Sequence, residues 1–379
     1  MTGGRSEVYS AEQPGWGELL SSVPHDVFHR AEYHRLSGFG HEGEPCLFAY
    51  REAAPGGGGV FLWPYLKREI PGSPWHDVSS VYGYAGPVCR GGEGEGAAEE
   101  FARRGCQALL AHWRESGVIA AFTRFHPLLA NAGFAEALEF AGPGGGSGRS
   151  PAGTTVSIDL TIPLEDQVRR YQKVLRQEIR KARESGFVTI EDQEFADAPS
   201  FVRLYRQTME RRNSRADYLI DEAWVEQFRA ALGSHARLFV TKWNGQVAAA
   251  LLAIEYAPFL HAHLTGINAD LAAHSPLKIL LDDIRIWGSQ RGLSSFHLGG
   301  GLGGREDSLF QFKRRFSPVT HPFQTGRWVL DRSRYEELER AHRDNLAARG
   351  YRVGNDGFFP IYRYQPTPAD ALEEQASEV

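Results

Sequence analysis

A lysine near the end of the chain is the residue best suited to stabilise a developing negative charge. The chain has 42 Lys and Arg residues but only six lysines, and one of them, Lys313, follows Phe312 in the segment FQFKRRF. An ammonium group on a flexible stem can approach an oxyanion that a broad guanidinium approaches less easily. A plain cationic surface patch is the alternative, because Arg314 and Arg315 follow directly.

A glycine run, Gly299 to Gly304, stands between a predicted strand and the helix that carries Lys313. It superficially matches a phosphate-binding loop, but no GKS or GKT follows it. The acidic residue that a GxGxxG dinucleotide site needs at the end of the next strand is also missing. We therefore interpret the run as a sharp, close-packed turn that aims the following helix.

A strongly basic segment, LEDQVRRYQKVLRQEIRKARESG, is predicted as one helix over 164–184. Four of its cations recur at helical spacing and would share one face: Arg169, Lys173, Arg176 and Arg180. Such a face can bind a polyanion, and Arg314 and Arg315 would add to it. The alternative is a solvated amphipathic helix whose apolar residues face the core.

A second basic cluster runs along the next predicted helix, 198–212, and its exit. The planar fork of arginine suits phosphate or carboxylate, and a tyrosine can stack on a substrate or hydrogen-bond to it. The candidate substrate-binding residues of this cluster are Arg211, Arg212 and Tyr218.

Two histidines, His261 and His263, alternate on a predicted strand and would face one side, where they could bind a ligand. A buried or otherwise satisfied pair is the more frequent outcome for such residues. The remaining histidines and the three scattered cysteines show no metal-ligand spacing, and no GxSxG motif occurs. We therefore predict no metal site, and no catalytic triad can be read from the sequence.

The elements that would position these residues alternate between helix and strand. The clearest local pattern is 236–256, two β-runs joined by the Asn244-Gly245 pair that a type I′ turn prefers. Strands and helices follow each other in loosely the same order in both halves, which indicates an internal duplication. The fold class is therefore α/β (α+β), with mixed sheets flanked by helices.

Gly-rich stretches divide the chain. At roughly 150 residues per domain the length predicts two domains. The stretch 54–59 is predicted as a loop tip and 141–153 as an interdomain linker or, alternatively, a long loop over a site. We expect one domain over 1–150, a second over 151–320, and a C-terminal segment, 321–379, that returns to the first domain and ends in an acidic tail.

Composition excludes several classes of protein. The net charge is −5, so the protein is not a general DNA-binding protein. The longest apolar stretch, 247–254, is far shorter than the roughly 20 residues of a membrane span, and the first residues lack an apolar signal core. We expect a cytoplasmic protein with reduced cysteines and no membrane span. The sequence does not determine the oligomeric state, and a monomer is favoured.

Several segments together resemble the FemABX-like family, in order from about residue 25 to 335. They are SSVYGYAGPV (79–88), AAFTRFHPLL (120–129), RQEIRKARESGFVT (176–189), LYRQTMERRN (204–213), and FHLGGG with DSLFQFKRRFSP. The resemblance implies two tandem GNAT-like domains. It also implies transfer of an aminoacyl group from aminoacyl-tRNA to an amine, on a peptidoglycan precursor or in a natural-product pathway, with no cofactor besides the tRNA.

By position, Phe312 and Lys313 fall on a Phe-Lys pair of this family, whose lysine is held to stabilise the tetrahedral intermediate. Arg211, Arg212 and Tyr218 lie near the family's acceptor-binding Arg and Tyr, while His126 stands where relatives often carry an acidic residue. The alternatives are an acyl-CoA-dependent N-acyltransferase and a non-catalytic RNA- or peptide-binding module. The glycine-free segment NADLAAHSPLKIL before the helix at Ser275 argues against a CoA pyrophosphate loop.

Overall fold

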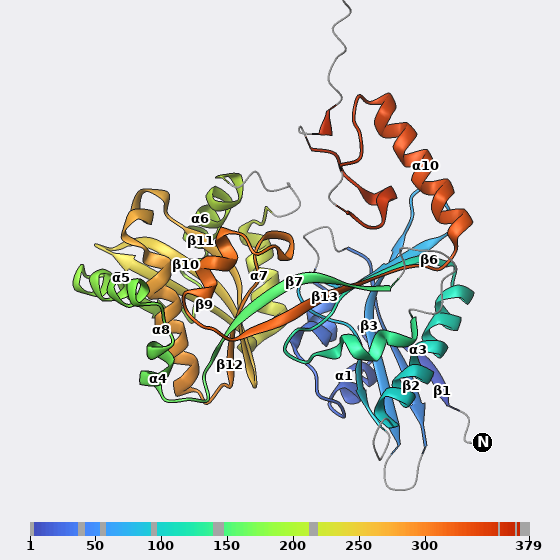
Figure 1. Cartoon of the computed structure of the whole chain (residues 1–379), viewed down its shortest axis with the longest axis horizontal. Helices are drawn as coiled ribbons and strands as arrows, with labels where there is room; N and C mark the ends of the chain where they lie inside the picture. Colours follow the sequence, from blue (N-terminus) through green and yellow to red (C-terminus); the bar gives the residue numbers. More distant parts are fainter. Residues whose placement is uncertain are drawn as a thin grey trace, which may run out of the picture.

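The structure is a computed structural model of the chain, and it describes residues 4–36, 42–53, 58–91, 97–138, 148–211, 219–354, 357–367 and 370–371. Within these ranges, thirteen strands form one mixed sheet in the order β1-β2-β3-β4-β6-β13-β7-β12-β11-β10-β9-β8, with β5 paired to β3. Figure 1 shows two lobes at the two ends of this sheet, joined where β7 and β13 cross between them.

Lobe 1 is built from the first third of the chain. Its elements are β1 (Arg5–Ser10), α1 (Gly15–Leu20), η1 (Val27–His29), α2 (Ala31–His34), β2 (Glu44–Glu52), β3 (Gly59–Glu69), β4 (His76–Ser79), β5 (Val88–Arg90), α3 (Ala97–Glu115), β6 (Val118–Arg124) and η2 (Asn131–Leu138). The long helix α3 packs its apolar stripe against β2 and β3 in an aromatic core that includes Trp63 and Trp113.

Lobe 2 follows in the chain. Its elements are β7 (Gly148–Asp159), α4 (Leu164–Arg169), α5 (Lys173–Glu184), β8 (Val188–Glu191), α6 (Ala198–Arg211), α7 (Glu222–Leu232), η4 (Gly233–His235), β9 (Ala236–Trp243), β10 (Gln246–Tyr256), β11 (Phe259–Ile267), η5 (Ala269–His274), α8 (Pro276–Gln290), β12 (Ser295–Gly299), η6 (Leu302–Gly304) and α9 (Ser308–Arg314). The hairpin β9–β10 has the predicted boundaries and turn.

Both lobes use the same strand pattern. In lobe 1, β1 to β4 are antiparallel neighbours in turn, β6 is parallel to β4, and β13 is antiparallel to β6. In lobe 2, β8 to β11 are antiparallel neighbours, β12 is parallel to β11, and β7 is antiparallel to β12. A helix forms the crossover that each parallel pair requires, α3 in lobe 1 and α8 in lobe 2. The predicted internal duplication is confirmed.

The last strand of each lobe is exchanged with the other lobe. β7 follows lobe 1 in the chain but pairs with β12 of lobe 2, whereas β13 (Thr320–Val329) follows lobe 2 and pairs with β6 of lobe 1. The predicted linker is therefore wrong for 148–153, which belong to β7. Gly153 is required by close packing, because a Cβ there would lie 1.7 Å from the carbonyl oxygen of Gly304.

The predicted basic helix 164–184 is also wrong as one element. It breaks between α4 and α5, where Gln172 is extended and its N–H donates to the carbonyl of Arg315 at 3.0 Å. Tyr171 is buried at the break and donates its hydroxyl hydrogen bond to Asp282 of α8 at 2.9 Å. These tertiary contacts outweigh helical periodicity, so Arg169 lies on a different helix from Lys173.

The end of the chain lies beside lobe 1. After β13 come α10 (Arg332–Ala348) and η7 (Ile361–Arg363). Arg363 donates to Asp77 of β4 at 2.5 Å, and Arg334 lies 3.5 Å from the ring centre of Trp75. Among the described helices, none combines the length and apolar character that a bilayer crossing requires.

A shared apolar cluster holds the lobes against each other. Phe28 and Tyr33 of lobe 1 are buried in one cluster with Phe201 and Phe228 of lobe 2. Their burial places the loop around residue 26 directly against β11, as the edge-to-face contact between Phe28 and His261 shows at 5.0 Å between ring centres.

Candidate active site between the lobes

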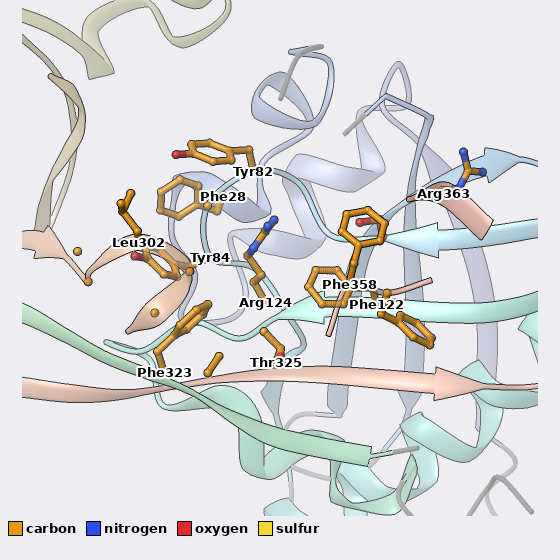
Figure 2. A pocket seen from close by; sticks show the side chains of 18 of the residues that line it. Phe28, Tyr82, Tyr84, Phe122, Arg124, Leu302, Phe323, Thr325, Phe358 and Arg363 are labelled. Atoms are coloured by element: carbon orange, nitrogen blue, oxygen red, sulfur yellow. The ribbon is translucent and has the colours of Figure 1, made fainter. Parts of the chain in front are cut away.

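A cleft of about 2220 Å³ opens where the two lobes meet. Lobe 2 lines it with β11, β12, the glycine turn and α9, and lobe 1 lines it with β3, β4, β6 and the loop at 82–84. Figure 2 shows Arg124 in the middle of the cleft, between Phe28 and Tyr84 on one side and Phe122 and Phe358 on the other. The walls thus combine aromatic rings with charged and polar side chains.

Lys313 lies in this cleft, as does Phe312. Asp307 caps α9 by accepting from the backbone N–H of Phe310 at 3.0 Å, and it also accepts from the N–H of Leu302 in the turn. The short helix therefore leaves the turn in one direction and presents the Lys313 amine to the carbonyl of Gly300 at 2.6 Å.

The glycine turn has the close-packed geometry predicted from the sequence. A Cβ at Gly304 would lie 1.5 Å from the carbonyl oxygen of Ala152 in β7, and one at Gly301 would lie 2.0 Å from that of Arg305. Gly299 has a φ of +75°, and a Cβ there would lie 3.4 Å from both Lys313 Nζ and Tyr84 Oη. Groups from both lobes thus converge on one point beside Gly299.

Several predicted binding residues are placed elsewhere. Arg169 pairs with Asp166 at 2.6 Å on α4, Arg314 donates to the carbonyl of Ser317, and Arg315 pairs with Glu178 at 2.5 Å. Lys173, Arg176 and Arg180 remain together on the exposed side of α5. The predicted shared face therefore shrinks to these three cations.

The second basic cluster is described only in part. Arg211 ends α6 and donates to the carbonyls of Gln207 and Ile267, so it links α6 to the end of β11. Arg212 and Tyr218 lie outside the described residues. Thr208 and Met209 of α6 line the cleft, so this helix end borders it.

The histidine pair on β11 is buried, and its two members have different surroundings. His263 stacks on Phe228 at 5.5 Å between ring centres, and burial together with nearby His261 lowers its pKa to about 3. His263 is therefore a neutral, packed side chain. His261, by contrast, belongs to a polar cluster that spans both lobes.

This cluster centres on Asp26, which is fully buried. Its Oδ2 accepts from His126 Nε2 at 2.6 Å and from His261 Nε2 at 2.7 Å, and its Oδ1 accepts from the N–H of Val27 at 2.7 Å. His261 Nδ1 lies 3.3 Å from Nδ1 of His297, the residue paired with it across β11 and β12. A polar chain thus runs from lobe 1 through β11 to β12.

Burial and mutual contact govern the charge states in the cluster. Burial opposes ionisation of Asp26, but the imidazoles of His261 and His126 hold the pKa of Asp26 well below its usual range. Burial lowers the pKa of His126, against the effect of Asp26. Burial, His261, His126, Lys313 and His321 all lower the pKa of His297, so this imidazole is neutral at pH 7.

A metal ion does not fit this donor set, although Asp26, His126 and His261 place one ligand atom each within 4.8 Å of one another. The backbone N–H of Leu129 donates to His126 Nδ1 at 3.1 Å. A neutral imidazole that binds a metal through Nε2 carries its proton on Nδ1. On His126 that proton would point at the proton of the Leu129 backbone N–H. His126 therefore keeps its proton on Nε2 and donates it to Asp26.

Sequence reasoning missed Asp26, Tyr84 and the role of His297 in this site. Asp26 lies 100 residues from His126 and 235 residues from His261 along the chain, so no local spacing links them. The one available signal was the pairing of strands, because His261 and His297 become cross-strand neighbours once β11 and β12 are known to be parallel.

A family model matches the second lobe of this chain, and a solved structure matches most of the chain. Residues 169–314 match the model of an acetyltransferase (GNAT) domain, which spans from the end of α4 to the end of α9. The crystal structure of FemX matches with a TM-score of 0.64 and 13% identity, over 88% of this chain and 99% of that one. The fold is that of FemX. This FemX fold is a tandem pair of GNAT-like units, and it agrees with the fold expected from the sequence.

Two further structures are similar to the FemX fold of this chain at lower scores. The C-terminal domain of a putative lysylphosphatidylglycerol synthetase from Agrobacterium fabrum has a TM-score of 0.49 and 15% identity, over 83% of this chain and 91% of that one. A tandem GNAT protein from the clavulanic acid biosynthesis pathway has a TM-score of 0.45 and 14% identity, over 86% and 98%. No curated protein sequence matches the chain significantly.

Proposed function

We propose that the protein is an aminoacyltransferase that moves an aminoacyl group from aminoacyl-tRNA to the amine of a small molecule or peptide. The acceptor amine attacks the carbonyl carbon of the tRNA ester, a C–N bond forms, and the C–O bond to the ribose breaks. Because the ester is already activated, no covalent enzyme intermediate is needed. The acceptor is a peptidoglycan precursor or a natural-product intermediate.

The observation that carries this proposal is the position of Lys313. Its ammonium group lies beside Gly299 in a cleft of about 2220 Å³, which has room for the ends of two substrates. A cation placed where negative charge develops on a carbonyl oxygen lowers the barrier of acyl transfer. Lys313 would stabilise the tetrahedral intermediate, with the acceptor entering along the aromatic wall of lobe 1.

The exposed cations of α5 support RNA as the acyl carrier. Lys173, Arg176 and Arg180 face solvent, and α5 is tied to α8 by the ion pair of Glu178 with Lys278 at 2.8 Å. Leu277 of α8, next in the chain to Lys278, lines the cleft. Phosphates held on α5 would thus lie on the side of lobe 2 from which a tRNA end would enter.

Acyl-CoA is the second candidate donor, and the matched acetyltransferase domain favours it. The turn before α8 is poorly suited to a pyrophosphate, however. Pro276 begins α8 and has no N–H, and the N–H of Lys278 donates to the carbonyl of Ser275 at 2.9 Å. Few free N–H groups remain to bind phosphate oxygens at this helix start.

The deciding experiment offers both donors to the full-length protein. Total tRNA charged with a mixture of labelled amino acids, or acetyl-CoA in a parallel reaction, is incubated with a panel of amines and muropeptides, and products are identified by mass spectrometry. We expect an aminoacylated product from charged tRNA, lost after RNase treatment. Acetylated product only would overturn the tRNA proposal, and tRNA binding without any product would favour the binding-module alternative.

A further inference from the structure

Among the described residues, four buried histidines have an Nε2 without a hydrogen-bond partner: His29, His34, His263 and His297. Of these, His297 both lines the cleft and contacts His261 of the buried cluster through its Nδ1. His297 Nε2 is fully buried, and among the described residues no group hydrogen-bonds to it. His297 also lines the cleft, where the ring of Tyr84 meets it edge to face at 5.0 Å between centres. A substrate group that reached this nitrogen would satisfy its unused hydrogen-bonding capacity.

The acceptors around the cluster indicate which ring nitrogens carry protons. His126 and His261 each donate an Nε2 proton to the same Asp26 oxygen. When Nε2 carries the only ring proton of His261, its Nδ1 presents a lone pair, and His297 then donates its Nδ1 proton across the 3.3 Å between them. His297 Nε2 then carries a lone pair, and His297 is one of the residues that line the cleft.

We propose that Asp26, His261 and His297 form a proton relay in which His297 Nε2 is the general base for the attacking amine. As the C–N bond forms, the amine proton passes to His297 Nε2 while the Nδ1 proton of His297 passes to His261 Nδ1. When the C–O bond breaks, both protons return along the same path and the ribose oxygen leaves as a hydroxyl. The inference rests on the proposed amide-forming function, but it holds for either acyl donor.

The relay solves an electrostatic difficulty of this site. Burial of His297 and the nearby groups His261, His126, Lys313 and His321 all lower its pKa, so a positive charge on its own ring is disfavoured. Passing the second proton on to His261 places the charge beside the Asp26 carboxylate instead. This is the arrangement by which a buried carboxylate stabilises the imidazolium of a catalytic histidine.

The base and the oxyanion donor also flank one point. His297 precedes Gly299 by two residues on β12, and a Cβ at Gly299 would lie 3.4 Å from both Lys313 Nζ and Tyr84 Oη. An amine beside His297 and a carbonyl oxygen beside Lys313 would therefore belong to the same reacting centre. Two residues from lobe 2 would act on the reaction, with Asp26 of lobe 1 as a positioning residue.

The kinetic test replaces His297 by Gln and uses His34→Gln as the matched control. His34 is an equally buried histidine, but it packs on Trp16 away from the cleft. We expect His297→Gln to lower kcat about 100-fold or more with little change in KM, and its rate to rise about tenfold per pH unit where the wild-type rate is level. An unchanged kcat or an unchanged pH profile in a folded variant would overturn the proposal.

The second test needs no substrate. Nitrogen-15 NMR of histidine-labelled protein reports the tautomer of each ring, with His261→Gln and His297→Gln used to assign the signals. We expect a proton on Nε2 of His261 and on Nδ1 of His297. A proton on His297 Nε2 at neutral pH would overturn the proposal, because that nitrogen could then accept none. If no donor reacts, the proposed function fails, while this spectrum still decides whether His297 can act as a base.

Discussion

The two lobes have a turn at the same place in the fold and use it differently. In each lobe the turn leaves the second strand of the parallel pair, after β6 in lobe 1 and after β12 in lobe 2. In lobe 1 it is closed by Asn131, which accepts from the N–H of His126 at 2.8 Å and donates to the carbonyls of Ala85 and Pro87. In lobe 2 it is built from glycines and opens on the cleft.

This difference gives the two duplicated lobes different roles: lobe 1 supports the site, and lobe 2 carries the groups proposed to react. The buried polar groups of the lobe 1 turn find their partners within lobe 1, and the turn holds His126 against Asp26. The lobe 2 turn carries only one side chain, Leu302, between its glycines, so α9 comes close to β7 and Lys313 reaches the cleft. One lobe therefore provides a rigid anchor for the proton relay, and the other carries the groups that would contact the substrates.

Removing the Lys313 amine, which lies beside the lobe 2 turn, should have the largest effect on turnover. Lys313→Ala should lower turnover about a hundredfold or more, because one oxyanion donor contributes about 3 kcal/mol to the transition state. Lys242→Ala is the control, since that lysine pairs with Asp197 on another part of lobe 2. Steady-state rates and thermal melts of both variants would check this, and near-normal turnover of Lys313→Ala would remove the lysine from the mechanism.

Adding one methyl group tests the close packing of the same turn. Gly304→Ala should cost about 2–3 kcal/mol of unfolding free energy, because its φ is +81° and the new Cβ meets the Ala152 carbonyl oxygen. Gly303→Ala is the matched control, with φ of +59° but open space around the Cβ, and should cost about 1 kcal/mol. Urea unfolding measures both, and equal losses would show that conformation alone, not packing, requires glycine here.

Opening the closed turn tests the supporting role of lobe 1. Asn131→Ala removes three hydrogen bonds from a side chain that is 1% exposed and leaves their partners unsatisfied. We expect a loss of about 2 kcal/mol in unfolding free energy, and a smaller change in turnover than for Lys313→Ala. If turnover fell as far as in Lys313→Ala while stability held, the lobe 1 turn would have a direct part in the reaction.

The features that could be predicted from the sequence are those that neighbouring residues determine. The hairpin β9–β10 was predicted with its turn, because Asn244-Gly245 specifies a type I′ geometry without help from the rest of the chain. The glycine turn before α9 was predicted for a similar reason. The break between α4 and α5 was missed, because it depends on Tyr171 reaching Asp282, more than a hundred residues away in the chain.

The catalytic candidates divide in the same way. Lys313 was found from the sequence because it follows Phe312 and a glycine run, all within one short segment. Asp26 lies in lobe 1 and joins His261 of lobe 2 only after the lobes pack together. No periodicity or spacing reports such a contact, so the relay depends on the tertiary structure.

The smallest expected effect is on tRNA binding, and it compares charge reversal on α5 of lobe 2 with charge reversal on α10 beside lobe 1. The double variant Lys173→Glu/Arg176→Glu reverses two exposed cations of α5, and it should weaken tRNA binding about tenfold and reduce the salt dependence of binding. Arg332→Glu/Arg340→Glu makes the same charge change on exposed residues of α10 beside lobe 1 and should bind tRNA as the wild type does. Filter binding across a salt series measures both. Equal weakening would mean that net charge alone attracts the RNA, and no weakening of the α5 variant would place the RNA on another surface.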